Sequence, residues 1–400
     1  MKELSKALLV SLWFMFLTFP ILVIRVNTVE NTVEWRWRNM LMVGAAAFAL
    51  HIVWGRMLAR GQRRQTGAGR KTPGGIAPGH RLSRFRRFGP AGILLLTAGL
   101  AALPFFSSLY QVNILITAMI YIMLGLGLNI VVGLAGLLNL GYVAFYAVGA
   151  YSYALLHLHY GLNFWLALPL GASLAALAGI ALGYPVLRLR GDYLAIVTLA
   201  FGEIIRLVLE NWSGFSFGPS GIADIPRPPL FGISMSLEAS TVFFYFLMLL
   251  MVTLTVFVVT RLQHSRIGRA WVALREDEIA CQAMGIDTTR IKLAAFALGA
   301  TWAGLGGVLF ASRTTFINPA CFTIWESMLI LCIVVLGGMG SIIGVVVGAL
   351  FLILLPEYLR AFSEYRVLLF GLLLVLMMIF RPGGLLPDRR RTYHFKGETG

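Results

Sequence analysis

The sequence predicts an all-α polytopic membrane protein, and three observations carry this prediction. Of the 400 residues, 58% are hydrophobic and only 12% are charged, which is about half the charged share of soluble proteins. Apolar runs of about 20 residues, the length that crosses a bilayer as a helix, recur along the chain. Basic residues gather in short segments beside these runs, as the positive-inside rule expects of cytoplasmic segments. An ordinary soluble globular enzyme is therefore excluded.

Residues 1–58 are predicted to form a two-helix membrane extension. Its apolar runs cover about 7–26 and 39–58, and the polar segment Asn27–Arg38 lies between them. Although two lysines precede the first run, no small-residue cleavage site follows it. We therefore expect an uncleaved helix and not a signal peptide.

A basic segment, residues 59–88, is predicted to be a cytoplasmic linker. Between Arg56 and Arg87 the chain has ten basic residues and no acid. The stretch Gly67–Gly75 is rich in glycine and shows no hydrophobic periodicity. Because the net charge of +16 is concentrated in such flanking segments, it indicates membrane topology, and no nucleic-acid partner is expected.

The other apolar runs are predicted to form a membrane core, residues 89–380, which a basic cytoplasmic tail, residues 381–400, follows. The polar block at 262–292 is expected in the cytoplasm, and the proline-containing segment 213–238 outside. The runs cover about 90–107, 113–133, 138–157, 164–187, 193–211, 241–260, 293–312, 327–355 and 366–380.

The run 327–355 is predicted to cross the membrane twice. Its glycines Gly337, Gly338 and Gly340 interrupt it, and such breaks join short helices in transporters. A single crossing would place the basic tail outside, against the positive-inside rule. Two crossings give twelve in all, ten in the core and two in the extension, with both termini in the cytoplasm.

A second glycine-rich break is expected around Gly133 and Gly136. The stretch Val131–Gly136 is similar to Val334–Gly340, and duplicated transporter halves carry paired interruptions of this kind. Chance similarity between helices rich in glycine, valine and leucine explains the likeness nearly as well.

The polar block is predicted to contain a short amphipathic helix from Glu276 to Met284, which docks a cytoplasmic partner. Acids at the start suit the positive end of the helix dipole, and Gly285 suits the left-handed position after the last turn. A solvated loop is the alternative. The residues assigned to this coupling loop are Arg269, Arg275, Glu276, Asp277, Glu278, Ile279, Ala280, Ala283, Met284 and Gly285.

Several motifs give the chain a resemblance to a known family. Glu278-Ile279-Ala280 followed by Gly285 resembles the coupling loop of permeases of ATP-binding-cassette (ABC) importers. The stretches Pro185–Leu199, Val334–Ser341 and Arg381–Pro387 are similar to LivM-type permease subunits of branched-chain amino acid importers. The likeness covers nearly all of 110–390, and the two-helix extension is also similar to that of LivM-type subunits.

The resemblance implies a core of about ten helices in a bacterial inner membrane, surrounded by membrane lipid. It implies partners as well: a LivH-type permease subunit, two cytoplasmic ATP-binding subunits and a periplasmic amino-acid-binding protein. The substrates would be leucine, isoleucine and valine. One departure from the family lies at Ser216–Gly221, where members usually carry Thr-Gly-Gly-Pro-Asn-Gly.

The chain itself is expected to be non-catalytic. It has no Gly-Lys dipeptide, which excludes a phosphate-binding loop of the form GxxxxGK[ST], so ATP hydrolysis is assigned to partners. The scattered histidines and cysteines predict no metal site, and no cofactor is expected. The alternative functions are a urea or short-amide ABC importer and an ion-coupled secondary amino acid transporter.

Four polar residues within apolar runs are candidates for the translocation path or for a conformational latch. Glu203 and Arg206 are three residues apart on one predicted helix and so share a face, where pairing lowers the cost of burying either charge. Direct contact with a zwitterionic substrate is the alternative role for this pair. Asn129 and Asn139 flank the first glycine break and either line the path or bridge helices.

Overall fold

The computed structural model describes residues 24–27, 32–35, 104, 108–186, 189, 191–228, 236–358, 371, 372, 375 and 383–386. The chain divides into two units, Met1–Gly89 and Pro90–Gly400. The predicted linker and both predicted helices of the extension lie outside the described residues, apart from the last residues of the first run.

In the first unit, strands β1 (Ile24–Asn27) and β2 (Thr32–Trp35) form an antiparallel hairpin in which Ile24 pairs with Trp35. The first apolar run, which is predicted to be a helix over about 7–26, therefore has extended backbone at Ile24–Val26. The hairpin sequences are rich in β-branched residues, which favour extended backbone.

The described part of the second unit is helical, and its long helices follow the predicted apolar runs. The elements are α4 (Leu109–Leu128), the π-helix η2 (Asn129–Leu134), α5 (Tyr142–Tyr160), α6 (Phe164–Val186), α7 (Asp192–Asn211), α8 (Ser213–Ser216), η3 (Gly218–Ser220), α9 (Leu237–Gln263), α10 (Arg266–Glu276), α11 (Glu278–Ala283), α12 (Thr288–Thr314), η4 (Pro319–Cys321), α13 (Ile324–Gly337) and α14 (Ile342–Tyr358).

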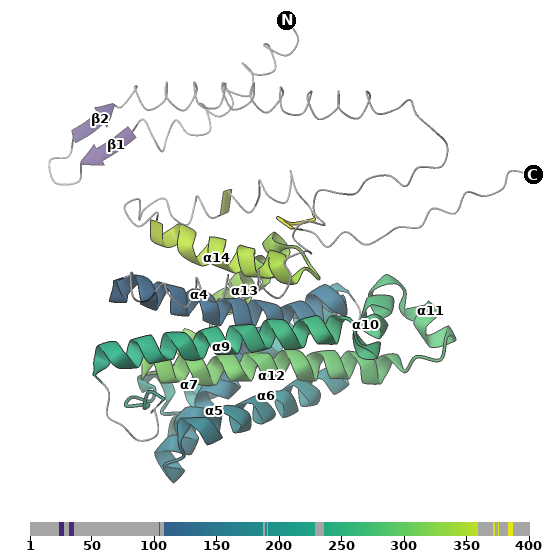
Figure 1. The fold of residues 1–400 in the computed structure, drawn as a ribbon, viewed down its shortest axis with the longest axis horizontal. Coiled ribbons are helices and arrows are strands. Elements are labelled where there is room, and N and C mark those ends of the chain that lie inside the picture. Colours follow the sequence, from purple (N-terminus) through teal and green to yellow (C-terminus); the bar gives the residue numbers. More distant parts are fainter. Residues whose placement is uncertain are drawn as a thin grey trace, which may run out of the picture. The chain divides into compact units, whose positions relative to one another are not determined.

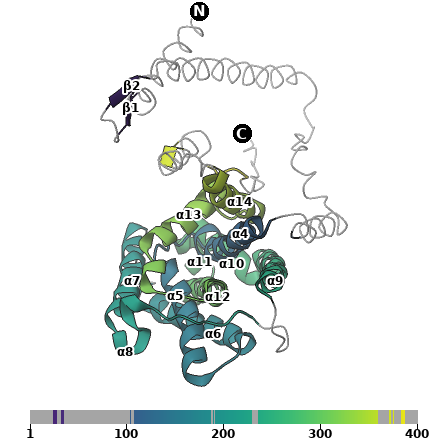
Figure 2. The ribbon, with the colours of Figure 1, turned by 90° about the vertical axis from the view of Figure 1, so that its left-hand side faces the viewer.

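Helix α12 lies at the centre of this bundle, in contact with α4, α5 and α6 (Figure 2). Small residues allow the close approach, as is usual between membrane helices. A Cβ atom on Gly304 would lie 2.5 Å from the Ala175 Cβ atom of α6, and one on Gly149 of α5 would lie 2.2 Å from the Gly304 carbonyl oxygen. Larger side chains at these positions would push the three helices apart.

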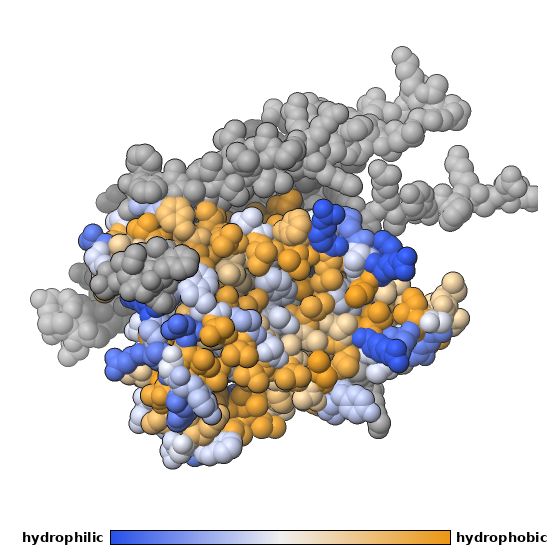
Figure 3. All heavy atoms as spheres, turned by 60° about the horizontal axis from the view of Figure 1, so that its bottom comes forward, coloured by the Kyte–Doolittle hydropathy of each residue, from blue (hydrophilic) through white to orange (hydrophobic). Residues whose placement is uncertain are grey.

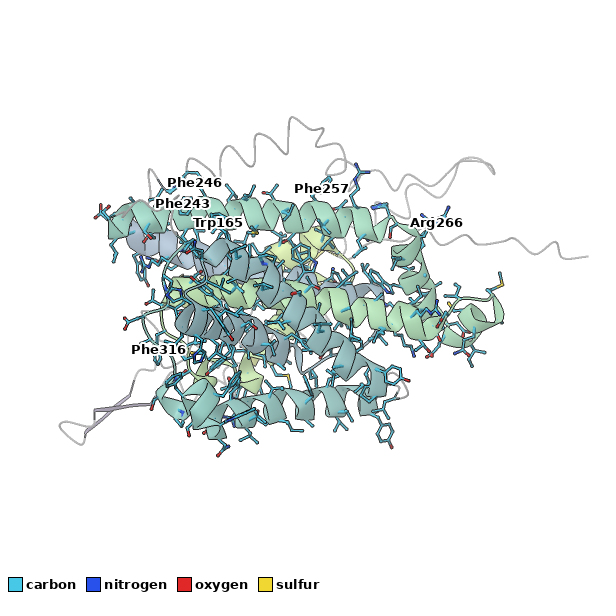
Figure 4. The ribbon with its side chains drawn as sticks, turned by 90° about the horizontal axis from the view of Figure 1, so that it is seen from below. Trp165, Phe243, Phe246, Phe257, Arg266 and Phe316 are labelled. Atoms are coloured by element: carbon cyan, nitrogen blue, oxygen red, sulfur yellow. The ribbon has the colours of Figure 1, made fainter. Side chains whose placement is uncertain are left out.

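The surface of the bundle suits a membrane. Hydrophobic side chains cover much of the face seen in Figure 3, and hydrophilic ones gather toward its ends. Phe243, Phe246 and Phe257 line the outer side of α9, while Arg266 and Phe316 lie at opposite ends of the bundle (Figure 4). Five described segments are long and apolar enough to cross a membrane: Leu109–Leu134, Phe164–Val186, Leu237–Gln263, Thr288–Thr314 and Pro319–Gly337.

The run 327–355 is split into two helices, as the glycines predict. Helix α13 ends at Gly337 and α14 begins at Ile342. Between them Gly338 and Gly340 have φ angles of 115° and 86°, a region that side chains disfavour. The first break differs in kind, because α4 continues directly into the π-helix, which ends at Leu134, two residues before Gly136 with its φ angle of 72°.

Candidate functional site

Helices α10 and α11 project from one end of the bundle (Figure 1). The sequence predicts a single helix from Glu276 to Met284, and this is wrong in its start: Glu276 is the last residue of α10. Asp277 has extended backbone and separates the two helices, and its carboxylate accepts hydrogen bonds from the amides of Ile279 (2.8 Å) and Ala280 (3.0 Å). An N-cap at Asp277 therefore sets where α11 begins.

The end of α11 follows the prediction. Gly285 has a φ angle of 79°, and a Cβ atom there would meet nothing within 4 Å. The glycine is thus required by its left-handed backbone and not by lack of space. Asp287 then caps α12 by accepting a hydrogen bond from the Arg290 amide at 3.1 Å.

Two contacts fasten α10 and α11 to α12. The indole of Trp271 is fully buried and donates a hydrogen bond to the Ile291 carbonyl at 2.8 Å. Lys292, whose side chain is 5% exposed, forms an ion pair of 2.6 Å with Glu278. The Glu278 carboxylate, assigned from sequence to the coupling loop, therefore neutralises a buried ammonium group.

The outward side of α11 is apolar. Ile279 and Met284 are 69% and 81% exposed, and the small residues Ala280 and Ala283 are exposed beside them. Arg269 of α10 is also exposed and donates to the His264 carbonyl at 2.9 Å. Exposed apolar side chains on a projecting element are typical of a protein interface.

Arg275 joins α10 to the first helix break. Its Nη1 atom donates a hydrogen bond to the Gly133 carbonyl at 2.6 Å. The methylene groups of Arg275 cover Gly136, where a Cβ atom would lie 2.7 Å from the arginine Cγ atom. Arg275, assigned from sequence to the coupling loop, therefore contacts the end of the π-helix that follows α4.

The second break meets the first at this same place. The Gly340 amide donates a hydrogen bond to the Asn129 side-chain oxygen at 2.8 Å. Gln263, the last residue of α9, donates to the Gly340 carbonyl at 3.4 Å. A Cβ atom on Gly133 would lie 2.5 Å from the Gly340 nitrogen. We call the set Asn129, Gly133, Gly136, Gly340 and Arg275 the break junction.

The C-terminal motif also reaches the second break. Amides of Leu385 and Leu386 donate hydrogen bonds to the carbonyls of Leu336 (2.8 Å) and Gly337 (3.2 Å). A Cβ atom on Gly384 would lie 2.5 Å from the Gly338 Cα atom. Segments that are distant in the sequence therefore meet at the second break. The contacts of Gln263 and of residues 383–386 were missed because no local pattern reveals contacts between distant segments.

The two asparagines lie near the first break, each with one amide group unsatisfied. Asn129 and Asn139 are 0% and 1% exposed, and their Nδ2 groups have no partner among the residues that the structure describes. The Asn139 oxygen accepts a hydrogen bond from the Gly141 amide at 3.0 Å. Buried, unsatisfied amide donors are costly and call for a functional reason.

Glu203 and Arg206 lie together on α7, as their spacing predicts, but the sequence missed a third member. Arg206 donates to Glu203 and, at 2.7 Å, to Glu210. The side chains of the three residues are 22% to 39% exposed. Because two carboxylates already surround the guanidinium, the cluster is poorly suited to bind the carboxylate of a substrate.

The loop that departs from the family pattern packs against the loop between α12 and α13. Ile222 and Ile317 form an antiparallel bridge. Gly218 and Gly221 have φ angles of 54° and 69°, as the turn requires. Phe217 also has a left-handed φ of 61° and is 44% exposed, in a position where family members usually carry glycine.

Comparisons with known proteins agree with these features. A sequence model of the family described as branched-chain amino acid transport system permease component matches residues 110–380. The chain is 52% identical over 309 residues to the high-affinity branched-chain amino acid transport system permease protein LivM of Escherichia coli, an alignment that covers 72% of this chain and 73% of that protein. The LivM protein of Salmonella typhimurium shows the same identity and coverage.

The chain also resembles the second permease of that system. It is 28% identical over 287 residues to the permease protein LivH of Salmonella typhimurium, with 66% of this chain and 91% of that protein covered. No solved structure matches the chain significantly. On the family match and on the identity to LivM, the chain belongs to the family of branched-chain amino acid transport permeases.

Proposed function

We propose that this protein is the LivM-type permease subunit of an ATP-driven, high-affinity importer of leucine, isoleucine and valine. The observation that carries the proposal is the identity of 52% over 309 residues to proteins named as high-affinity branched-chain amino acid transport permeases. An identity of this size over most of a chain supports a shared substrate class as well as a shared fold.

The importer would contain a LivH-type permease subunit, two cytoplasmic ATP-binding subunits and a periplasmic amino-acid-binding protein. Without a phosphate-binding loop of its own, the chain needs partners to hydrolyse ATP. The surface formed by Ile279, Ala280, Ala283 and Met284 offers an apolar knob of the kind that fills a pocket on a partner. We assign this surface to an ATP-binding subunit.

Coupling would then pass through the break junction. Arg275 lies in α10, which directly precedes the docking helix α11, and its guanidinium donates a hydrogen bond to the Gly133 carbonyl at 2.6 Å. Displacement of α10 by a closing pair of ATP-binding subunits would pull on the first break and, through Asn129, on Gly340 of the second. Helices that are broken at glycine can change direction at low cost, which alternating access requires.

The other candidate residues have supporting roles in this proposal. Asn129 and Asn139 offer free amide donors to a substrate or to water beside the first break. The cluster of Glu203, Arg206 and Glu210 acts as a latch on α7, since its charges satisfy one another. The subunit resides in the inner membrane with twelve crossings, and both termini face the cytoplasm.

Co-purification tests the assignment. The full chain, expressed with its neighbours, should bring down a second permease and two ATP-binding subunits, and the complex in vesicles should import leucine only with ATP and the binding protein. Ile279→Glu should weaken attachment of the ATP-binding subunits at least about tenfold, because a charge would enter an apolar pocket. Leucine transport by the isolated chain without ATP would contradict the proposal.

A further inference from the structure

A polar cluster lies among α4, α12 and α13, at the end of α13 opposite the second break. Its members are Tyr121, Arg313 and Glu326. The Tyr121 hydroxyl donates a hydrogen bond to Glu326 Oε2 at 2.5 Å, and Arg313 Nη2 donates to the Asn113 carbonyl at 3.0 Å. All three side chains are half-buried, so they are neither sealed in the core nor fully solvated.

The two charges of this cluster are not neutralised by ion pairs. Neither Arg313 nor Glu326 forms one within the described part of the chain. Their positions in helices favour the charged forms, since Arg313 lies in the last turn of α12 and Glu326 in the first turn of α13. One charge of each sign, unpaired between membrane helices, marks a functional site.

Aromatic rings form a wall beside the charges. The ring centroid of Tyr146 lies 5.3 Å from those of both Phe310 and Phe322. Phe310 lies three residues before Arg313 on α12, and Phe322 lies four residues before Glu326, so the wall and the charges lie at the same ends of α12 and α13. Tyr146 and Phe322 are 5% and 1% exposed, and Phe310 is half-buried, so the wall belongs to the apolar interior beside the charges.

A further observation points to a ligand. Tyr151 is 3% exposed, and its hydroxyl has no hydrogen-bond partner among the described residues. Its ring centroid lies 6.0 Å from that of Phe322, which places an unused donor at the same wall. Arg227 adds a second positive charge near Arg313, which strengthens the attraction for an anion.

We propose that Arg313, Glu326 and Tyr121, with the rings of Tyr146, Phe310 and Phe322, form a contact site for the amino acid zwitterion as it passes through the permease. This inference rests on the proposed function and names where the substrate is held. Arg313 would bind the α-carboxylate through its forked donors, and Glu326 would bind the α-ammonium group. The aliphatic side chain would lie on the aromatic wall.

The site explains a preference for apolar zwitterions. A carboxylate alone would leave Glu326 without a partner of opposite charge, and an amine alone would do the same to Arg313, so each would lose one charge-assisted contact. The cluster of Glu203, Arg206 and Glu210 cannot serve in this way, because its charges pair with one another. The contact site is therefore distinct from the latch on α7.

The test uses the complete importer in vesicles and a diazirine analogue of leucine that the wild-type complex imports. After irradiation during ATP-driven uptake, cross-linked residues are mapped by mass spectrometry. We expect labels on Tyr146, Phe310 or Phe322. Glu326→Gln keeps an acceptor for the Tyr121 hydroxyl but removes the charge, and should lower both labelling and leucine uptake about tenfold.

Glu238→Gln is the matched control, since Glu238 also lies in the first turn of a helix, α9, and is exposed. It should leave labelling and uptake unchanged. Arg313→Lys retains a charge without the fork and should lower labelling less than Arg313→Gln does. Co-purified ATP-binding subunits and ATP hydrolysis should stay normal in every variant, which a merely structural role would not allow.

Labels confined to other residues of the wild-type protein would overturn the inference even if a variant failed to fold. Equal labelling in Glu326→Gln and Glu238→Gln would overturn it as well, while the proposed function would stand as long as wild-type vesicles import leucine. Wild-type vesicles that fail to import leucine with all partners present would instead contradict the proposed function.

Discussion

Arg275 was assigned from sequence to the coupling loop, and its contact in the fold could not be read from the sequence. Its place in the coupling loop marks it as functional, but the loop pattern describes only neighbours along the chain. The contact with the Gly133 carbonyl joins positions that lie far apart in the sequence. Only the packing of α10 against the first break reveals that the side chain points inward.

Replacing Arg275 should separate ATP hydrolysis from transport. Arg275→Ala loses the contact with the Gly133 carbonyl and the cover over Gly136, so movement of α10 no longer reaches the breaks. We expect leucine uptake per ATP hydrolysed to fall about tenfold in vesicles, which corresponds to about 1.4 kcal/mol of lost coupling. Arg266→Ala, at the exposed start of the same helix (Figure 4), is the control and should keep full coupling.

The charges on α7 lead to a prediction about unequal losses. Because Arg206 serves both Glu203 and Glu210, Arg206→Gln leaves two carboxylates without a partner, whereas Glu203→Gln leaves one ion pair intact. Thermal unfolding in detergent should show the greater loss for Arg206→Gln, by about 1–2 kcal/mol. The double variant Glu203→Gln/Arg206→Gln should recover part of the stability that Arg206→Gln loses. Strictly additive losses would mean that the side chains do not interact.

At the scale of elements, the sequence predicts the long helices and the break at Gly337–Gly340, but not the π-helix or the separate helix α10. Long apolar runs fix α6, α9 and α12 to within a few residues, because membrane helices must be apolar along their length. The π-helix at Asn129–Leu134 has no local signature, since its extra residue per turn is stabilised by contacts with α12 and α10. The separate helix α10 was missed because its start depends on a side-chain cap at Ser265 and its end on the extended backbone of Asp277, whose side chain caps α11.

Gly285 allows backbone strain to be separated from crowding. A Cβ atom there meets nothing, so Gly285→Ala introduces only the cost of a left-handed residue, about 1–2 kcal/mol. Gly161 at the end of α5 has a similar φ, 62°, and similarly open surroundings. Both alanine variants should lose similar thermal stability, but only Gly285→Ala should also lower the leucine imported per ATP, because it tilts α11. Equal coupling in the two variants would count against α11 as the docking helix.

For the molecule as a whole, the main feature that the sequence does not predict is that segments far apart along the chain meet at one place. Five segments were recognised from the sequence separately or not at all: the first break, the second break, the end of α9, helix α10 and the C-terminal segment 383–386. Hydrogen bonds from Gln263, Arg275 and Leu385 bring them to one end of the bundle. Periodicity and composition report burial along each helix, whereas this assembly depends on tertiary contacts.

The same convergence bears on topology. If the loop between α13 and α14 lies on the cytoplasmic side with Arg275 and Gln263, then α13 enters the membrane from outside and α14 returns there. The crossing that follows brings the basic tail to the cytoplasm. A single cysteine at Phe395→Cys, in a chain whose three native cysteines are replaced by serine or alanine, should resist an impermeant maleimide in intact cells and react after permeabilisation. A cysteine at Ser220, in the loop predicted to be external, serves as the control and should react in intact cells. Labelling of position 395 from outside would show that the run 327–355 crosses an odd number of times, and the count of twelve crossings would be wrong.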